Sequence, residues 1–170
     1  RQLRLAREAG ITGADYHVLR GRLNRLSGDM KSAQVNAVAA IGYQPDHGQA
    51  WSLRVESADD NDLEQIVSAL SEELSKGTSA NTPYYRTLMF YALAEGQDRL
   101  GKLSAAAASL NTANTLQKNA LEESGRSYNS QTEATRTATL KQQYKTPVKT
   151  SDSSQYRPIF IVGMPRSGTT

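Results

Sequence analysis

The stretch that decides the fold is ADYHVLRGRLNRLSGDMKSAQVNAVAAIGYQPDH, residues Ala14–His47. Small side chains recur in both of its halves, at Gly21, Ala33, Ala37 and Ala40. Gly28 and Asp29 divide the two halves, and Pro45 stands near the end. Small side chains let two helices approach closely, so the stretch predicts a helical repeat module.

The register of this stretch resembles that of a tetratricopeptide unit, which runs about 34 residues as two antiparallel helices. Counted from Ala14, the turn falls at Gly28–Asp29 and the closing proline at Pro45. His17 stands where the pattern has an aromatic residue, and we interpret it as a substitute packing residue. The resemblance implies a first repeat unit near residues 14–47.

A second, degenerate unit is expected over residues 48–75. Trp51 takes its aromatic position, but the polar run at residues 58–62 cuts its first helix short. Either of two capping boxes would start the second helix: Asn61 with Glu64, or Asp62 with Gln65. An apolar stripe at helical spacing follows, formed by Leu63, Ile66, Val67, Leu70 and Leu74.

A third unit is expected over residues 87–120, with Phe90 at the aromatic position and Gly101–Lys102 at the turn. Its packing residues would be Leu93, Ala94, Ala106, Leu110 and Ala113, and Leu116 would extend the apolar face. Residues 1–124 would thus form a helical solenoid, with residues 1–10 as the last helix of an earlier unit. Each unit buries its face only against its neighbours. The concave face of such a solenoid commonly binds peptides, so a peptide partner is expected there.

Residues 125–157 differ in composition, because Ser, Thr, Gln and Lys dominate. We predict a polar helix over Thr132–Tyr144, which Pro147 would follow as a helix breaker. The segment is interpreted as a connector between two domains, partly helical; a disordered tail is the alternative.

The chain closes on PIFIVGMPRSGTT, Pro158–Thr170. Its continuous apolar run predicts a strand that is buried on both faces, as in a parallel sheet. Gly163 and Gly168 give the following loop backbone freedom. Backbone N–H groups at such a loop and helix start bind anions, and Arg166 adds a forked cation suited to phosphate or sulfate. The segment therefore predicts an anion site.

The spacing from Gly163 to Gly168 matches the phosphate loop of nucleotide hydrolases, but the next residue does not. That motif needs Lys followed by Ser or Thr, whereas Thr169 stands at the Lys position here. The departure argues against hydrolysis of ATP or GTP. A donor with a single 5′-phosphate, whose transferred group lies beside Arg166, suits the loop better.

This segment resembles the 5′-phosphosulfate loop of sulfotransferases that use 3′-phosphoadenosine 5′-phosphosulfate (PAPS), in the branch that includes tyrosylprotein sulfotransferases and bacterial proteins with preceding tetratricopeptide repeats. The resemblance covers residues 158–170 and implies the start of an α/β sulfotransferase domain. It implies that Arg166 stabilises the sulfuryl group during transfer. It further implies that the co-substrate is bound by Pro165, Arg166, Ser167, Gly168, Thr169 and Thr170.

The same resemblance places the general base and the 3′-phosphate site beyond Thr170, so this chain alone is expected to be inactive. The acceptor would carry a hydroxyl group, on protein tyrosine, carbohydrate, lipid or a small molecule. No metal is expected to be needed. The alternatives are a non-enzymatic repeat scaffold for protein–protein interaction and, less favoured, a phosphate-loop kinase or hydrolase.

Composition excludes several other classes of function. The net charge is +3, from 20 basic and 17 acidic residues, which is too balanced to suggest nucleic-acid binding. The chain has no cysteine, so disulfides and thiolate metal sites are excluded. His17 and His47 lack metal-ligand partners at useful spacing. No membrane partner is expected, since no apolar run reaches membrane-spanning length. Because the chain begins with Arg1, an upstream segment is expected; a bacterial cytoplasmic location is the default expectation.

Overall fold

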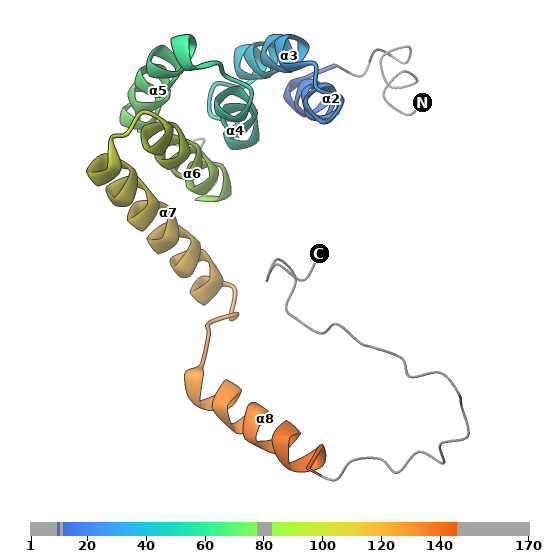
Figure 1. The fold of residues 1–170 in the computed structure, drawn as a ribbon, viewed down its shortest axis with the longest axis vertical. Helices are drawn as coiled ribbons and strands as arrows, with labels where there is room; N and C mark the ends of the chain where they lie inside the picture. The colour runs from blue at the N-terminus through green and yellow to red at the C-terminus, as the bar shows by residue number, and fades with distance from the viewer. Residues whose placement is uncertain (1–9, 11, 78–82, 146–170) are drawn as a thin grey trace, which may run out of the picture. The chain divides into compact units, whose positions relative to one another are not determined.

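The computed structural model describes residue 10, residues 12–77 and residues 83–145, shown in colour in Figure 1. These residues form seven helices, α2 to α8, so the prediction of a mostly α chain is confirmed for them. The chain divides into two compact units, with the boundary between Ser127 and Tyr128. The strand and loop predicted for residues 158–170 lie outside the described residues, as does most of the segment 1–10.

The first helix pair consists of α2 (Ala14–Leu26) and α3 (Met30–Tyr43). Gly28 adopts a φ of 85° in the turn between them, which favours glycine, and Asp29 caps α3 by accepting the Ser32 N–H at 3.0 Å. The predicted turn is therefore confirmed. So is the role of the small residues, because Ala33, Ala37 and Ala40 are fully buried.

The second pair consists of α4 (Gly48–Glu56) and α5 (Asp60–Ser75). The predicted stripe of five apolar residues on α5 is confirmed, since all of them are buried. The predicted capping boxes are wrong. Asp59 caps the helix instead, by accepting the N–H groups of Asn61 and Asp62 at 3.0 and 3.1 Å. The helix therefore includes Asn61 and Asp62 in its first turn rather than beginning after them.

The third pair consists of α6 (Pro83–Arg99) and α7 (Leu103–Glu123). Helix α6 begins before the expected start near Thr87, and the turn contains Gly101 with a φ of 71°, as predicted. The prediction that Leu110 fills the packing surface is wrong, because it is 44% exposed. Its side chain faces a groove between the two helices, described below. Four of the predicted packing residues are buried: Leu93, Ala94, Ala106 and Ala113.

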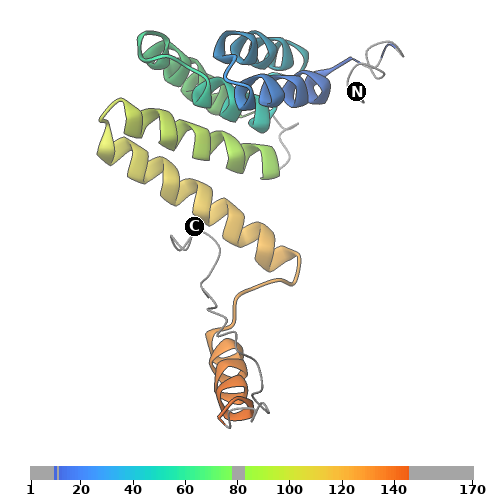
Figure 2. The ribbon, with the colours of Figure 1, turned by 45° about the vertical axis from the view of Figure 1, so that its right-hand side comes forward.

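The three pairs stack in sequence order, as the two views in Figures 1 and 2 show. The largest core cluster joins α4, α5 and α6, and it includes Trp51, Val55, Leu63, Leu70, Met89 and Leu93. Leu53 of α4 belongs to a separate core cluster, in which it packs against Ala33 and Ala37 of α3. Burial of each such large side chain contributes roughly 1.5–3 kcal/mol to stability. Helix α4 therefore joins the two halves of the stack.

The second unit contributes one described helix, α8 (Ser130–Gln143), close to the polar helix that the sequence predicts. Asn129 caps it by accepting the Thr132 N–H at 3.0 Å, and none of its residues is buried. None of the helices in the described part of the chain combines the length and apolar character needed to cross a membrane.

Candidate functional site

The predicted co-substrate site lies outside the described residues. Pro165, Arg166, Ser167, Gly168, Thr169 and Thr170 all belong to the segment 146–170. The geometry that follows is that of the repeat stack and of α8, where polar and apolar side chains gather at four places.

A polar cluster around one buried histidine joins the N-terminal ends of α2, α4 and α6. His47 is fully buried and caps α4, because its Nδ1 accepts the Ala50 N–H at 3.3 Å. Since Nδ1 accepts, the ring carries its proton on Nε2. Nε2–H therefore donates to Oδ1 of Asp15 on α2, at 3.1 Å. The Tyr85 hydroxyl oxygen on α6 lies 3.3 Å from the same nitrogen, and the two rings are 4.6 Å apart.

The surroundings of this cluster affect the Tyr85 hydroxyl and hold the helix ends together. Burial raises the pKa of Tyr85, and the nearby charges of Asp15 and Asp46 add to the effect. A tyrosine with a raised pKa stays protonated at neutral pH and does not serve as a base there. Tyr84 beside it accepts a hydrogen bond from the Gln49 side-chain amide at 3.1 Å. The cluster thus fixes three helix ends to one another.

Sequence reasoning missed this cluster, because it considered His47 only as a metal ligand. The available signal was the position of His47 directly before Gly48, where a polar side chain caps a helix. His17 behaves as predicted: it packs between the rings of Tyr16 and Tyr43, and its Nδ1 lies 3.1 Å from Asn36 Oδ1. In the described segments no three His, Cys, Asp or Glu side chains are grouped to hold a metal ion.

Charged groups join the C-terminal ends of the same three helices. Arg25 of α2 pairs with Glu56 of α4 at 3.1 Å. Arg99 of α6 donates to the carbonyl oxygens of Val55 and Ala58 at 2.8 and 3.0 Å, and to Asp60 Oδ1 at 3.2 Å. Together with the His47 cluster, these contacts show that α2, α4 and α6 run parallel.

An open groove of about 480 Å³ lies between α6 and α7. Its lining is mostly apolar, with Tyr91, Ala94, Leu103, Ala106, Ala107 and Leu110, and its charged members are Glu95 and Asp98. We call it the α6–α7 groove. Leu103 and Leu110 are 67% and 44% exposed. Partial burial raises the pKa of Glu95, and Glu56 adds to this, whereas Arg99 and Arg25 oppose it.

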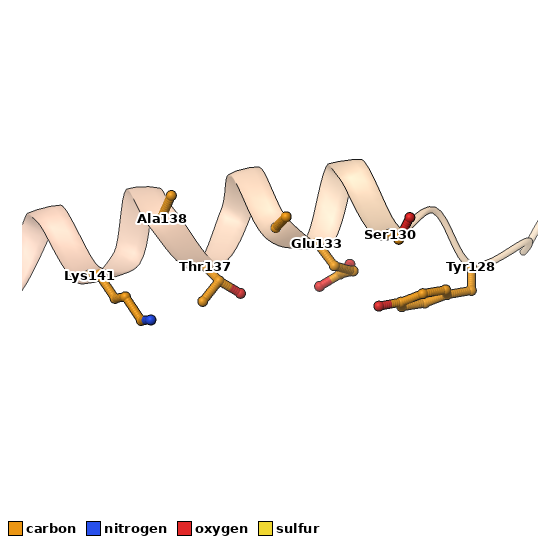
Figure 3. A pocket seen from close by; sticks show the side chains of 7 residues that line it. Tyr128, Ser130, Glu133, Thr137, Ala138 and Lys141 are labelled. Carbon is orange, nitrogen blue, oxygen red and sulfur yellow. The ribbon is translucent and has the colours of Figure 1, made fainter.

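Helix α8 presents an open face of mixed polar and apolar side chains, which Figure 3 shows from close by. Glu133, Thr137 and Lys141 follow one another at one-turn spacing and extend to the same side, where the Tyr128 ring also lies. Thr137 and Lys141 are exposed. With one acid, Glu133, and one base, Lys141, about two turns apart, this face has no concentration of charge that would select an anion or a cation.

Comparisons with known proteins do not assign this chain to a family: no family model, no curated protein and no solved structure matched it.

Proposed function

We propose that the chain combines a tetratricopeptide-type repeat stack with the first strand and 5′-phosphosulfate loop of a PAPS-dependent sulfotransferase. The observation that carries the proposal is the segment Pro158–Thr170, in which an apolar run leads directly into a loop with two glycines, an arginine and three hydroxyl side chains. This order of residues suits an anionic donor bound at the end of a buried strand.

The donor set of the loop fits a phosphosulfate group chemically. Backbone N–H groups at residues 168–170 and the hydroxyls of Ser167, Thr169 and Thr170 would bind the 5′-phosphate oxygens. Arg166 would hold the sulfuryl oxygens with its forked guanidinium and stabilise charge that develops during transfer. PAPS, when bound, supplies the sulfuryl group. These interactions need no metal ion, because the loop itself provides the positive potential.

In the transfer, the acceptor oxygen forms a bond to sulfur while the bond from sulfur to the 5′-phosphate oxygen breaks, and 3′,5′-ADP leaves. The acceptor hydroxyl proton passes to a general base, which we place beyond Thr170. The residues of this chain would therefore orient the donor and stabilise charge, but would not complete the reaction. The repeats would recruit the hydroxyl acceptor or a partner protein.

A non-enzymatic scaffold is the second candidate, and the open α6–α7 groove favours it, since an apolar surface of this kind suits a protein partner. A phosphate-loop kinase or hydrolase is less favoured, because Thr169 stands where that motif requires Lys.

The test is calorimetric binding of 3′,5′-ADP to the full-length parent protein without magnesium. We expect binding that weakens by about tenfold or more in Thr169→Ala. Arg166→Ala should weaken it less, because 3′,5′-ADP lacks the sulfuryl group that Arg166 would hold. Thr139→Ala and Arg136→Ala, the same changes on α8, should bind as the unchanged protein does. A folded full-length protein that binds no 3′,5′-ADP would overturn the sulfotransferase proposal and leave the scaffold. Binding only with magnesium and ATP would favour the kinase or hydrolase.

A further inference from the structure

The α6–α7 groove is equivalent to the surface of the first helix pair, α2 and α3, against which α4 packs. In the first pair, the surface formed by α2 and α3 receives Leu53 of α4: a methyl group added to Gly21 would collide with the Leu53 side chain, and Leu53 clusters with Ala33 and Ala37. In the second pair, α4 and α5 receive α6 through Met89, Ala92 and Leu93. Each pair thus packs against the helix that follows it.

Counting from the turn glycines Gly28 and Gly101 relates the first pair to the third. Five residues that line the groove are equivalent to residues of the first pair that contact α4 or the residue after it. Ala94 corresponds to Gly21, Asp98 to Arg25, Ala106 to Ala33, Ala107 to Gln34 and Leu110 to Ala37. Among the described residues of the first unit, no helix follows α7. The groove is therefore a helix-docking surface whose occupant the described part of this unit does not supply.

Two differences between these surfaces specify the occupant. The side chains of the third pair are larger at two of these positions, because Ala94 and Leu110 replace Gly21 and Ala37. A helix that docks there needs a side chain smaller than Leu53, such as Ala or Val, at its point of closest approach. The side chain at this point must therefore be smaller than the one that α4 uses.

The charge is reversed as well. Arg25 pairs with Glu56, which lies three residues after Leu53 in α4. Asp98 takes the place of Arg25 in the third pair, and Glu95 lies one turn before it. The neighbouring cation, Arg99, already donates to Val55, Ala58 and Asp60. A helix that docks here would therefore need Lys or Arg at the position where α4 has Glu56, so that it can pair with Asp98. Burying the Asp98 carboxylate without such a partner would be costly.

We propose that the α6–α7 groove docks a helix of a partner protein that carries Ala or Val at its contact point and Lys or Arg three residues later. Affinity comes from the apolar floor, and selectivity comes from Asp98 and Glu95 on the rim. This surface acts without the nucleotide loop, so the proposal stands apart from the sulfotransferase assignment.

The test uses the full 170-residue chain and a fluorescently labelled, Ala-rich helical probe peptide of roughly four turns. One probe has Ala at the contact point and Arg three residues later; its twin has Glu in place of that Arg. Fluorescence anisotropy should show binding of the Arg probe, with its affinity weakened at high salt, and about threefold or more weaker binding of the Glu twin. Equal binding of both probes would overturn the proposal.

Variants of the chain locate the site. Leu110→Lys should weaken binding by about tenfold or more, and Leu103→Gln should weaken it less. Asp98→Arg should reverse the preference, so that the Glu twin binds better, while the matched Glu123→Arg on α7 changes nothing. Circular dichroism verifies that each variant is folded, which is expected because these side chains are exposed.

Two further outcomes would overturn the proposal by naming another occupant. If sedimentation shows self-association that Leu110→Lys abolishes, a second copy of the chain fills the groove. If no probe binds and Leu110→Lys lowers the melting temperature of the monomer, another segment of the same chain covers it.

Discussion

Nε2 of His47 lies 3.1 Å from Oδ1 of Asp15, so the residue that caps α4 also holds the start of α2. The partners differ in their surroundings. The His47 side chain is completely buried, whereas the Asp15 side chain is largely exposed to water. Loss of the imidazole would therefore leave a cavity and an uncapped helix. Loss of the carboxylate would remove one acceptor of the ring N–H, while the Tyr85 hydroxyl oxygen would still lie 3.3 Å from that nitrogen.

We expect His47→Ala to lower the free energy of unfolding by about 2–4 kcal/mol, from the lost cap and the cavity together. His47→Asn should lose less, because Asn also caps helices but is too short to reach Asp15. Urea unfolding followed by circular dichroism measures both. His17→Ala is the matched control, with a smaller expected loss, since His17 is only half-buried. Equal losses for the two alanine variants would contradict this role of His47.

Gly48 and Gly42 should respond to the same substitution with opposite signs. A Cβ on Gly48 would collide with the Tyr85 carbonyl oxygen and would lie 2.8 Å from Leu88 Cβ, so α4 and α6 would have to separate. Gly48→Ala should cost about 1–3 kcal/mol of stability. A Cβ on Gly42 meets no atom within 4 Å, so Gly42→Ala should stabilise the helix by about 0.5 kcal/mol. Thermal unfolding distinguishes them; a neutral Gly48→Ala would show that the contact adapts.

Arg99 closes the end of α4 from a different helix. Arg99→Ala removes hydrogen bonds to two backbone carbonyls and should cost about 1.5–3 kcal/mol. Arg99→Lys should restore less than half of this, because an ammonium group does not reproduce the forked geometry of a guanidinium. Chemical denaturation provides the measurement, with the exposed Arg22→Ala as the control, which should change little. Full recovery by Lys would mean that charge alone is responsible.

Glu95 gives a pH-dependent prediction. Its pKa is raised in the folded state, chiefly by burial and then by Glu56. A raised carboxyl pKa means that ionisation disfavours folding: the penalty is absent below the unfolded pKa and develops as pH rises through the folded pKa. Glu95→Gln should therefore raise the melting temperature at pH 7 and not at pH 4. The same gain at both values would show that ionisation is not its cause.

The fold was largely predictable where local rules decide it. The turn at Gly28 and the stripe from Leu63 to Leu74 depend on backbone freedom and helical spacing, and both can be recognised in one sequence. The helix start at Asp59 was missed because several polar residues in a row could each cap, and packing chooses among them. Leu110 was misassigned because its burial depends on whether a further helix arrives.

The candidate site was less predictable, for a physical reason. His47, Asp15 and Tyr85 come from three separate helices, so their meeting depends on how those helices pack. The loop that we propose to bind a nucleotide is the opposite case. Residues 163–170 form a continuous segment whose chemistry can be inferred from the sequence. They lie outside the described residues, so the anion site that the sequence places there stays a prediction.

The position of α4 has a consequence for how the stack opens. Every residue of α4 is buried or half-buried, with Leu53 facing one neighbouring pair and Trp51 the other. We expect its amide hydrogens to exchange with solvent only after contacts on both sides have been broken, whereas α7 packs chiefly against α6 within the first unit. Amide exchange should therefore be slowest in α4 and fastest toward the end of α7, so that the shortest helix of the stack sets the limit of its global stability.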